Sequence, residues 1–218
     1  MALLLIAHRA GNDLKLLSKA FAAGVDYAEA DVWLYRNRLE VRHNKTLGPI
    51  PVLWDRWSLR PGWKRRLYLS EVIRAANGLG NLYLDLKGDE NALPAKLISE
   101  LRLIGASDLA FSSPVWWYLD ELKPEFPKAA LFYTVSSVER LEEFRPRLAR
   151  REISAVAIKN AVVSKDVIRE LRDAGVEDIT TWGVDTREDA RAAFASGLNG
   201  VNSKNLELLA GLRTEGGP

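Results

Sequence analysis

Short apolar runs alternate with stretches of helical periodicity along this chain of 218 residues. Apolar runs of roughly four to eight residues predict buried strands, and apolar residues three and four positions apart predict amphipathic helices. The predicted strands are 3–8, 27–35, 82–87, 109–113, 129–133, 156–159, 179–184 and 200–202. The predicted helices lie between them, around 13–23, 69–77, 91–104, 115–122, 137–150, 164–174, 187–196 and 205–212.

This alternation predicts an α/β fold, a (β/α)8 TIM barrel that forms a single domain over residues 1–218. A doubly wound open sheet is the alternative arrangement for the same order of elements. The hydrophobic content of 47% is sufficient for one core. One connection is irregular, because 38–43 predicts an extra strand and 46–67 a long loop. We expect residues 36–67 to form an insertion over the mouth of the barrel, where long loops are often functional.

Composition excludes several classes of function. The chain has no cysteine, which excludes disulfides, thiolate metal sites and a thiol nucleophile. Its 31 lysines and arginines against 29 acids give a formal charge of +2, so we expect no nucleic-acid partner. The apolar run at 2–7 is too short for a signal peptide, and nothing approaches the roughly 20 apolar residues that span a bilayer. A cytoplasmic protein is the expectation.

Reactive side chains gather at the carboxyl ends of the predicted strands, where barrels of this kind assemble their active sites. Glu29 and Asp31 lie two residues apart on one strand and therefore point to the same face. Asp85, on the third strand, would join them in the barrel mouth. Three converging carboxylates repel one another unless a cation lies among them, and oxygen ligands favour a hard ion, Mg²⁺ or Ca²⁺. We expect these three acids to hold a divalent metal rather than to be solvated surface charges.

The strand ends also carry the two histidines of the chain, His8 and His43. A lone histidine is usually a packing or surface residue, but two that flank an acidic cluster indicate a functional pair. Basic, aromatic and other polar residues follow at the remaining strand ends: Arg9, Lys87, Ser112, Ser113, Tyr133, Lys159, Trp182 and Asn202.

Taken in order, these motifs resemble the glycerophosphodiester phosphodiesterase family, part of the phospholipase-C-like phosphodiesterase TIM barrels. The chain has His8-Arg9, Glu29-Ala30-Asp31, His43, Asp85-Leu86-Lys87 and a late Trp182, in the order of the family pattern. It departs from that pattern at several points. The Gly after Arg is displaced to Gly11, Asp85 replaces the commoner Glu, and Asn202-Ser203-Lys204-Asn205 stands where the family has an Asp before Pro.

The resemblance implies a metal-dependent hydrolase that cleaves glycerophosphodiesters or lysophospholipids to an alcohol and a glycerol phosphate. It implies Glu29, Asp31 and Asp85 as metal ligands and His8 and His43 as the acid and base. It also implies substrate contacts, with Arg9 and Lys87 on the phosphate and Lys159 and Trp182 elsewhere on the substrate. The metal, among Mg²⁺, Ca²⁺ and Mn²⁺, and the role of each histidine stay open. Two alternatives stay open as well: a sphingomyelinase-D-like enzyme that forms a cyclic phosphate, as Asp-Leu-Lys suggests, and a noncatalytic barrel that binds a phosphorylated ligand.

The insertion contains WDRWSLRPGWKRR at 54–66, which interleaves tryptophans with basic residues. Such a stretch suits a transient contact with a membrane surface or with a choline-like or phosphate-bearing head group. A lid that packs on the barrel, or a contact between subunits, explains the same residues. The sequence does not indicate the oligomeric state.

Overall fold

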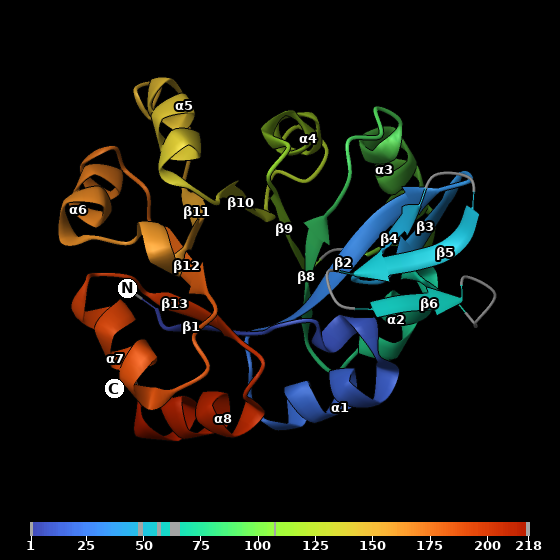
Figure 1. Ribbon diagram of the computed structural model, residues 1–218, viewed down its shortest axis with the longest axis horizontal. Coiled ribbons are helices and arrows are strands. Elements are labelled where there is room, and N and C mark those ends of the chain that lie inside the picture. Colours follow the sequence, from blue (N-terminus) through green and yellow to red (C-terminus); the bar gives the residue numbers. More distant parts are fainter. Residues whose placement is uncertain (1, 48–49, 56–57, 62–65, 107, 217–218) are drawn as a thin grey trace.

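The computed structural model shows a closed barrel (Figure 1). It describes residues 2–47, 50–55, 58–61, 66–106 and 108–216, with the backbone alone between 45 and 61. The barrel strands are β1 (Leu4–Ala7), β2 (Tyr27–Tyr35), β8 (Asn81–Leu86), β9 (Leu109–Ser113), β10 (Ala130–Val135), β11 (Ala155–Lys159), β12 (Asp178–Trp182) and β13 (Gly200–Ser203). All neighbours in this order pair in parallel, and β13 pairs with β1. Closure confirms the predicted TIM barrel and excludes an open sheet.

A helix follows each barrel strand and packs on the outside of the barrel (Figure 1). The helices are α1 (Leu14–Ala22), α2 (Leu69–Ala76), α3 (Leu93–Ile104), α4 (Trp116–Leu122), α5 (Val138–Leu148), α6 (Lys165–Asp173), α7 (Arg187–Ala195) and α8 (Leu206–Glu215). Polar side chains begin several of them: Ser137, Ser164, Thr186 and Asn205 each accept a hydrogen bond from a backbone N–H of the first turn. Short helices of this kind are stabilised mainly by the apolar face that each packs on the barrel.

The insertion after β2 differs from the sequence prediction in part. The extra strand is confirmed as β3 (Arg38–Val41), which pairs antiparallel with β2 through a tight turn at Arg36 and Asn37, both at positive φ. The described residues between 46 and 67 form strands, which corrects the predicted loop. The backbone forms a separate antiparallel sheet of β4 (Lys45–Leu47), β5 (Ile50–Asp55) and β6 (Ser58–Pro61), and β7 (Leu67–Tyr68) then pairs with β3.

Two prolines lie in this small sheet. Pro51 and Pro61 have no N–H to donate to a neighbouring strand. In the structure Pro51 lies at an irregularity in the pairing of β4 with β5, and Pro61 is the last residue of β6. Both are positions at which a missing donor costs little. Figure 1 draws the small sheet on the side of β2 and β3; its placement over the barrel mouth remains a prediction.

Toward the amino ends of the strands, the barrel interior is filled mainly by apolar and aromatic side chains. Tyr27, Tyr83 and Phe132 stack with ring centroids 6.2 and 5.1 Å apart, beside Ile6 and small alanines. Burial raises the pKa of the Tyr83 phenol well above its usual value, so this layer stays uncharged. The reactive side chains of the candidate site lie at the other end, beyond the carboxyl ends of the strands, as expected for this fold.

Candidate active site

Alternation along the strands determines which side chains enter the barrel mouth. Ile6, Tyr83, Phe132 and Ala157 lie in the interior cluster, so the residues two positions later point to the same side. The upper inward positions are His8, Asp31, Asp85, Ser112, Thr134, Lys159, Trp182 and Asn202. Eight neighbouring strands thus supply one ring of side chains, nearly all of them polar.

The three predicted metal ligands meet in this ring. Glu29, Asp31 and Asp85 each offer a carboxylate oxygen, and the three oxygens lie within 4.8 Å of one another. Asp31 and Asp85 are register partners on β2 and β8. The side chains of Glu29 and Asp31 are each only 1% exposed, and that of Asp85 is 16% exposed. We call these three residues the acid wall.

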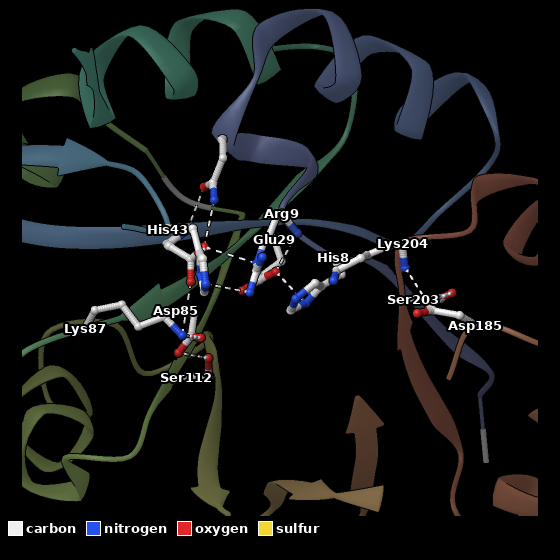
Figure 2. A network of polar contacts seen from close by, with 12 residues as sticks. His8, Arg9, Glu29, His43, Asp85, Lys87, Ser112, Asp185, Ser203 and Lys204 are labelled. Carbon is white, nitrogen blue, oxygen red and sulfur yellow. Dashed lines mark hydrogen bonds and ion pairs between the residues drawn. The ribbon is translucent and has the colours of Figure 1, made fainter. Parts of the chain in front are cut away.

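Arg9 connects the end of β1 to the acid wall (Figure 2). Its backbone is left-handed, with φ 58°, and this turn directs its N–H to Glu29 Oε2 at 2.6 Å. Its guanidinium lies 2.8 Å from His43 Nε2 and 3.9 Å from Asp31 Oδ2. The following turn packs tightly on β2, because a Cβ on Gly11 would lie 2.6 Å from the Cβ of Ala30. The displaced glycine therefore has a steric role of its own.

Each histidine contacts one carboxylate of the acid wall. His8 Nδ1 lies 3.0 Å from Glu29 Oε2, and His43 Nδ1 lies 3.4 Å from Asp31 Oδ2. A carboxylate at one ring nitrogen orients an imidazole and fixes the site of its proton. The structure therefore brings His8 and His43, which lie far apart in the chain, to the same acidic cluster.

Lys87 supplies a positive charge inside the acid wall. Its Nζ lies 3.0 Å from Asp31 Oδ1 and also bonds Asp85. Burial alone would lower the pKa of Lys87, but the charges of Asp85 and Asp31 outweigh burial and raise it above its usual value. Lys87 is therefore a permanent cation at neutral pH.

The two aspartates of the acid wall differ in their proton affinity. Burial would raise the pKa of Asp31, but hydrogen bonding with His43 and the charge of Lys87 hold it well below the usual range. Burial raises the pKa of Asp85 to about 6, and the charges of Glu29 and Asp31 add to that rise while Lys87 opposes it. Asp31 is thus held ionised by the protein, whereas the charge of Asp85 is poorly compensated.

Residues that sequence analysis missed complete the acid wall. Asn12 donates from Nδ2 to Asp31 Oδ2 at 2.7 Å, and its Oδ1 accepts the backbone N–H of Asp31 at 2.9 Å. Ser112, which had no assigned role, donates to Asp85 Oδ1 at 2.9 Å. Asn12 could not be found from periodicity because it lies in the 3-10 turn after β1. Its position there depends on the tertiary approach of that turn to β2.

Sequence analysis also missed a cluster of side chains around the segment that carries His43. Glu40 is buried, binds Arg42 at 2.9 Å and also binds Arg66. Arg42 further donates to the carbonyl of Asn44, so the residues on either side of His43 are fixed. Arg42 and Arg66 also lie over the ring of Tyr35, with centroid distances of 5.9 and 4.6 Å. Through Glu40 on β3, this cluster joins Arg42, just after β3, to Arg66, just before β7.

The remaining predicted residues separate into two groups. Lys159, Trp182 and Asn202 occupy inward-facing positions near the carboxyl ends of β11, β12 and β13. Ser113 and Tyr133 do not enter the mouth, which corrects their prediction as mouth residues. Tyr133 donates instead to Asp120 at 2.8 Å on the helix side, and Ser113 donates to the carbonyl of Leu86. The side chains of 54–65, which carry the tryptophans of the insertion, fall outside the described residues.

The acid wall fits a divalent cation by its donor chemistry. Three carboxylates converge, and two of them are almost fully buried. The charge of Lys87 lowers the pKa of Asp85, but not enough to cancel the rise that burial and the other two acids cause. Carboxylate oxygens select hard ions such as Mg²⁺ and Ca²⁺. Glu29, Asp31 and Asp85 could therefore hold one such ion between the two histidines.

Known structures resemble this chain over nearly its whole length. A phosphodiesterase of Oleispira antarctica, solved with the product sn-glycerol-3-phosphate, has a TM-score of 0.77 and 19% identity over 96% of either chain. A glycerophosphodiester phosphodiesterase of Parabacteroides distasonis has a TM-score of 0.73 and 16% identity over 97% of both chains. That of Thermotoga maritima has a TM-score of 0.72 and 20% identity, over 98% of this chain and 99% of the other. No family model and no curated protein sequence matches.

At such low identity, these comparisons define the fold class, a (β/α)8 barrel of the kind that glycerophosphodiester phosphodiesterases adopt. The resemblance inferred from the motifs is thereby confirmed for the architecture. Among the described residues, no helix combines the length and apolarity that a membrane crossing requires.

Proposed function

We propose that this chain is a metal-dependent glycerophosphodiester phosphodiesterase that uses His8 and His43 as its acid and base. The observation that carries this proposal is the juxtaposition of two histidine–carboxylate pairs, His8 with Glu29 and His43 with Asp31, on either side of a three-carboxylate cluster. The neighbour from Oleispira antarctica was solved with a glycerol phosphate product, which fits such a substrate.

The cations of the site would bind the scissile phosphate. Lys87 and Arg9 carry permanent charge close to the acid wall, and Arg9 can exchange its contact with His43 for a phosphate oxygen. A divalent ion on Glu29, Asp31 and Asp85 would add Lewis-acid stabilisation of the charge that develops on the phosphate. Fixed charges that require no rearrangement lower the barrier most effectively.

The histidine contacts suggest how the proton roles divide. His8 Nδ1 faces Glu29 Oε2 at 3.0 Å, which leaves Nε2 available as an acceptor toward the barrel mouth. His43 Nε2 instead faces the guanidinium of Arg9 at 2.8 Å. His8 is therefore our candidate for the base that deprotonates the nucleophile. Once substrate phosphate draws Arg9 away, His43 Nε2 would take up a proton from solvent, and the resulting imidazolium would protonate the leaving alkoxide.

Water and a neighbouring hydroxyl of the substrate are both suitable nucleophiles. The second would give a cyclic phosphate, as in the sphingomyelinase-D-like alternative that Asp85-Leu86-Lys87 suggests. Phosphorus NMR of the first product distinguishes the two, because a cyclic diester and a monoester have different shifts. The noncatalytic alternative is disfavoured because a phosphate-binding site has no need of two carboxylate-oriented imidazoles.

The experiment that tests the proposed function is an assay of protein treated with EDTA and then supplied with Mg²⁺, Ca²⁺ or Mn²⁺. Substrates would be glycerophosphodiesters and lysophospholipids with different head groups. Metal-dependent release of an alcohol and glycerol phosphate is expected. Absence of turnover with every ion and substrate would reject the enzymatic proposal and favour the noncatalytic barrel.

Lysophospholipid substrates would require contact with a lipid surface, and the stretch 54–66 is our candidate for that contact. Cosedimentation of the intact protein with anionic liposomes, compared with Trp57→Ala, tests it. We expect the substitution to reduce the bound fraction. Equal binding by both proteins would assign these residues to a lid or a subunit contact.

A further inference from the structure

Opposite the acid wall, three neighbouring strands present side chains that take no part in the proposed proton transfer or metal binding. Lys159, Trp182 and Asn202 lie side by side, because Lys159 pairs in register with Trp182 and Trp182 with Asn202. Around the closed barrel, β11 is four strands away from β2 in either direction. We call these three residues the far wall, since it faces the acid wall across the mouth.

Lys159 gives the far wall an uncompensated positive charge. It is exposed, and within the described part of the chain no carboxylate pairs with it. The two cations of the acid wall behave differently, because Arg9 and Lys87 each contact Asp31. A lysine whose preceding inward neighbours are Ala155 and Ala157 stands above a small, apolar floor. Nothing in that floor offsets its charge.

Asn202 adds a polar atom without a partner. Its Oδ1 is buried and makes no hydrogen bond with any described residue. An unsatisfied buried carbonyl oxygen destabilises the folded protein, and a ligand that donates a hydrogen bond to it removes this cost. Asn202 also pairs in register with Ile6, two residues before His8, so the far wall continues directly into the catalytic strand. Between Asn202 and Lys159, Trp182 offers a partly buried aromatic surface.

We propose that the far wall is a head-group subsite selective for alcohols that carry a carboxylate or another anionic group. This inference rests on the proposed function, because it requires a phosphodiester held at the acid wall. Lys159 would pair with the anionic group, and Asn202 would bond an adjacent hydroxyl or ammonium. A head group with only a quaternary ammonium would meet repulsion from Lys159, which is how a site rejects one ligand while accepting another.

Glycerophosphoserine and glycerophosphoethanolamine test this proposal, since they differ by a single carboxylate. We expect wild-type protein, loaded with its activating ion, to show a higher kcat/KM for the serine diester. Lys159→Met should lower the ratio of the two kcat/KM values about tenfold, the value of a hydrogen bond to a charged group. Lys159→Arg should retain most of the preference. Lys165→Met removes the same charge from the exposed start of α6 and should leave the ratio unchanged.

Three results would overturn the inference. They are an equal preference for both diesters in wild-type protein, a ratio that Lys159→Met does not move, and an equal loss for both substrates, which would place Lys159 on the shared phosphate. If wild-type protein turns over neither diester, the proposed function fails first. Calorimetric binding of both diesters to the metal-loaded His8→Ala variant then decides this inference alone, because the proposed subsite predicts tighter binding of the serine diester and its loss in Lys159→Met.

Discussion

The two walls of the barrel mouth are built on opposite principles. Around the acid wall, charged groups are paired with one another: Asp31 contacts Asn12, His43 and Lys87. In the far wall Lys159 has no partner among the described residues, and Asn202 Oδ1 is buried without one. A network of paired charges is preorganised for chemistry common to all substrates. An unpaired charge is completed by the molecule that binds, and it therefore determines which substrate is accepted.

The largest expected effect lies in the acid wall, at the histidines. His8→Ala and His43→Ala should each reduce kcat by about 10²- to 10⁴-fold, the usual contribution of a positioned acid or base. Because both side chains are partly exposed, melting temperatures should change little. Steady-state kinetics and thermal unfolding measure the two quantities. Near-normal turnover by either folded variant would remove that histidine from the mechanism.

Next in size is a difference between the two aspartates of the acid wall. Their pKa values are shifted in opposite directions, so the metal-free protein favours the charge of Asp31 and disfavours that of Asp85. Asp31→Asn should therefore destabilise the metal-free protein, by about 3 kcal/mol for a broken buried pair. Asp85→Asn should be neutral or stabilising. Urea unfolding in EDTA measures both, and equal destabilisation by the two substitutions would contradict this account of the pKa shifts.

The pH dependence of metal binding sharpens the same difference. The pKa of Asp85 is about 6 in the folded protein, above the value of about 3.9 for an unperturbed Asp, so its ionisation opposes folding as pH rises through this window. A bound cation requires the ionised form. Affinity for Mg²⁺ should therefore be constant above pH 6 and fall about tenfold for each pH unit below it. Calorimetric titration from pH 5 to 8 measures this, and an affinity independent of pH would argue against Asp85 as a ligand.

The smallest expected effect lies in the far wall. Asn202→Leu removes a buried oxygen that has no partner, so the free energy of unfolding should stay constant or rise by about 1 kcal/mol. The same substitution should raise KM for a polar head group without a comparable change in kcat. Denaturant unfolding and Michaelis–Menten kinetics report the two. A loss of stability similar to that of Asp31→Asn would show that Asn202 is part of a satisfied network.

The sequence predicted the architecture and the acid wall for the same reason. Apolar runs define strands, and a period of two then places Glu29 and Asp31 on one face irrespective of distant contacts. Tyr133 shows the limit of this argument, because the predicted strand at 129–133 ends two residues before the observed end of β10 at Val135. The inward side chain of that strand is Phe132, and its neighbour Tyr133 therefore faces the helices.

Other parts of the site depend on tertiary contacts that no periodicity encodes. Asn12 reaches Asp31 only because Arg9 adopts a left-handed turn and Gly11 allows close approach to β2. Glu40 and Arg66 meet across the insertion, 26 residues apart in the chain. In each case the deciding interaction lies outside the local window from which strands and helices were predicted.

The central claim is that Glu29, Asp31 and Asp85 share one divalent ion between His8 and His43. Anomalous scattering from crystals grown with Mn²⁺ tests it most directly. The account predicts a single strong peak bonded to one oxygen of each carboxylate, at about 2.0–2.4 Å, as expected for a hard cation. A peak elsewhere on the protein, or an ion that leaves Asp85 bound to Lys87 and Ser112 alone, would contradict it.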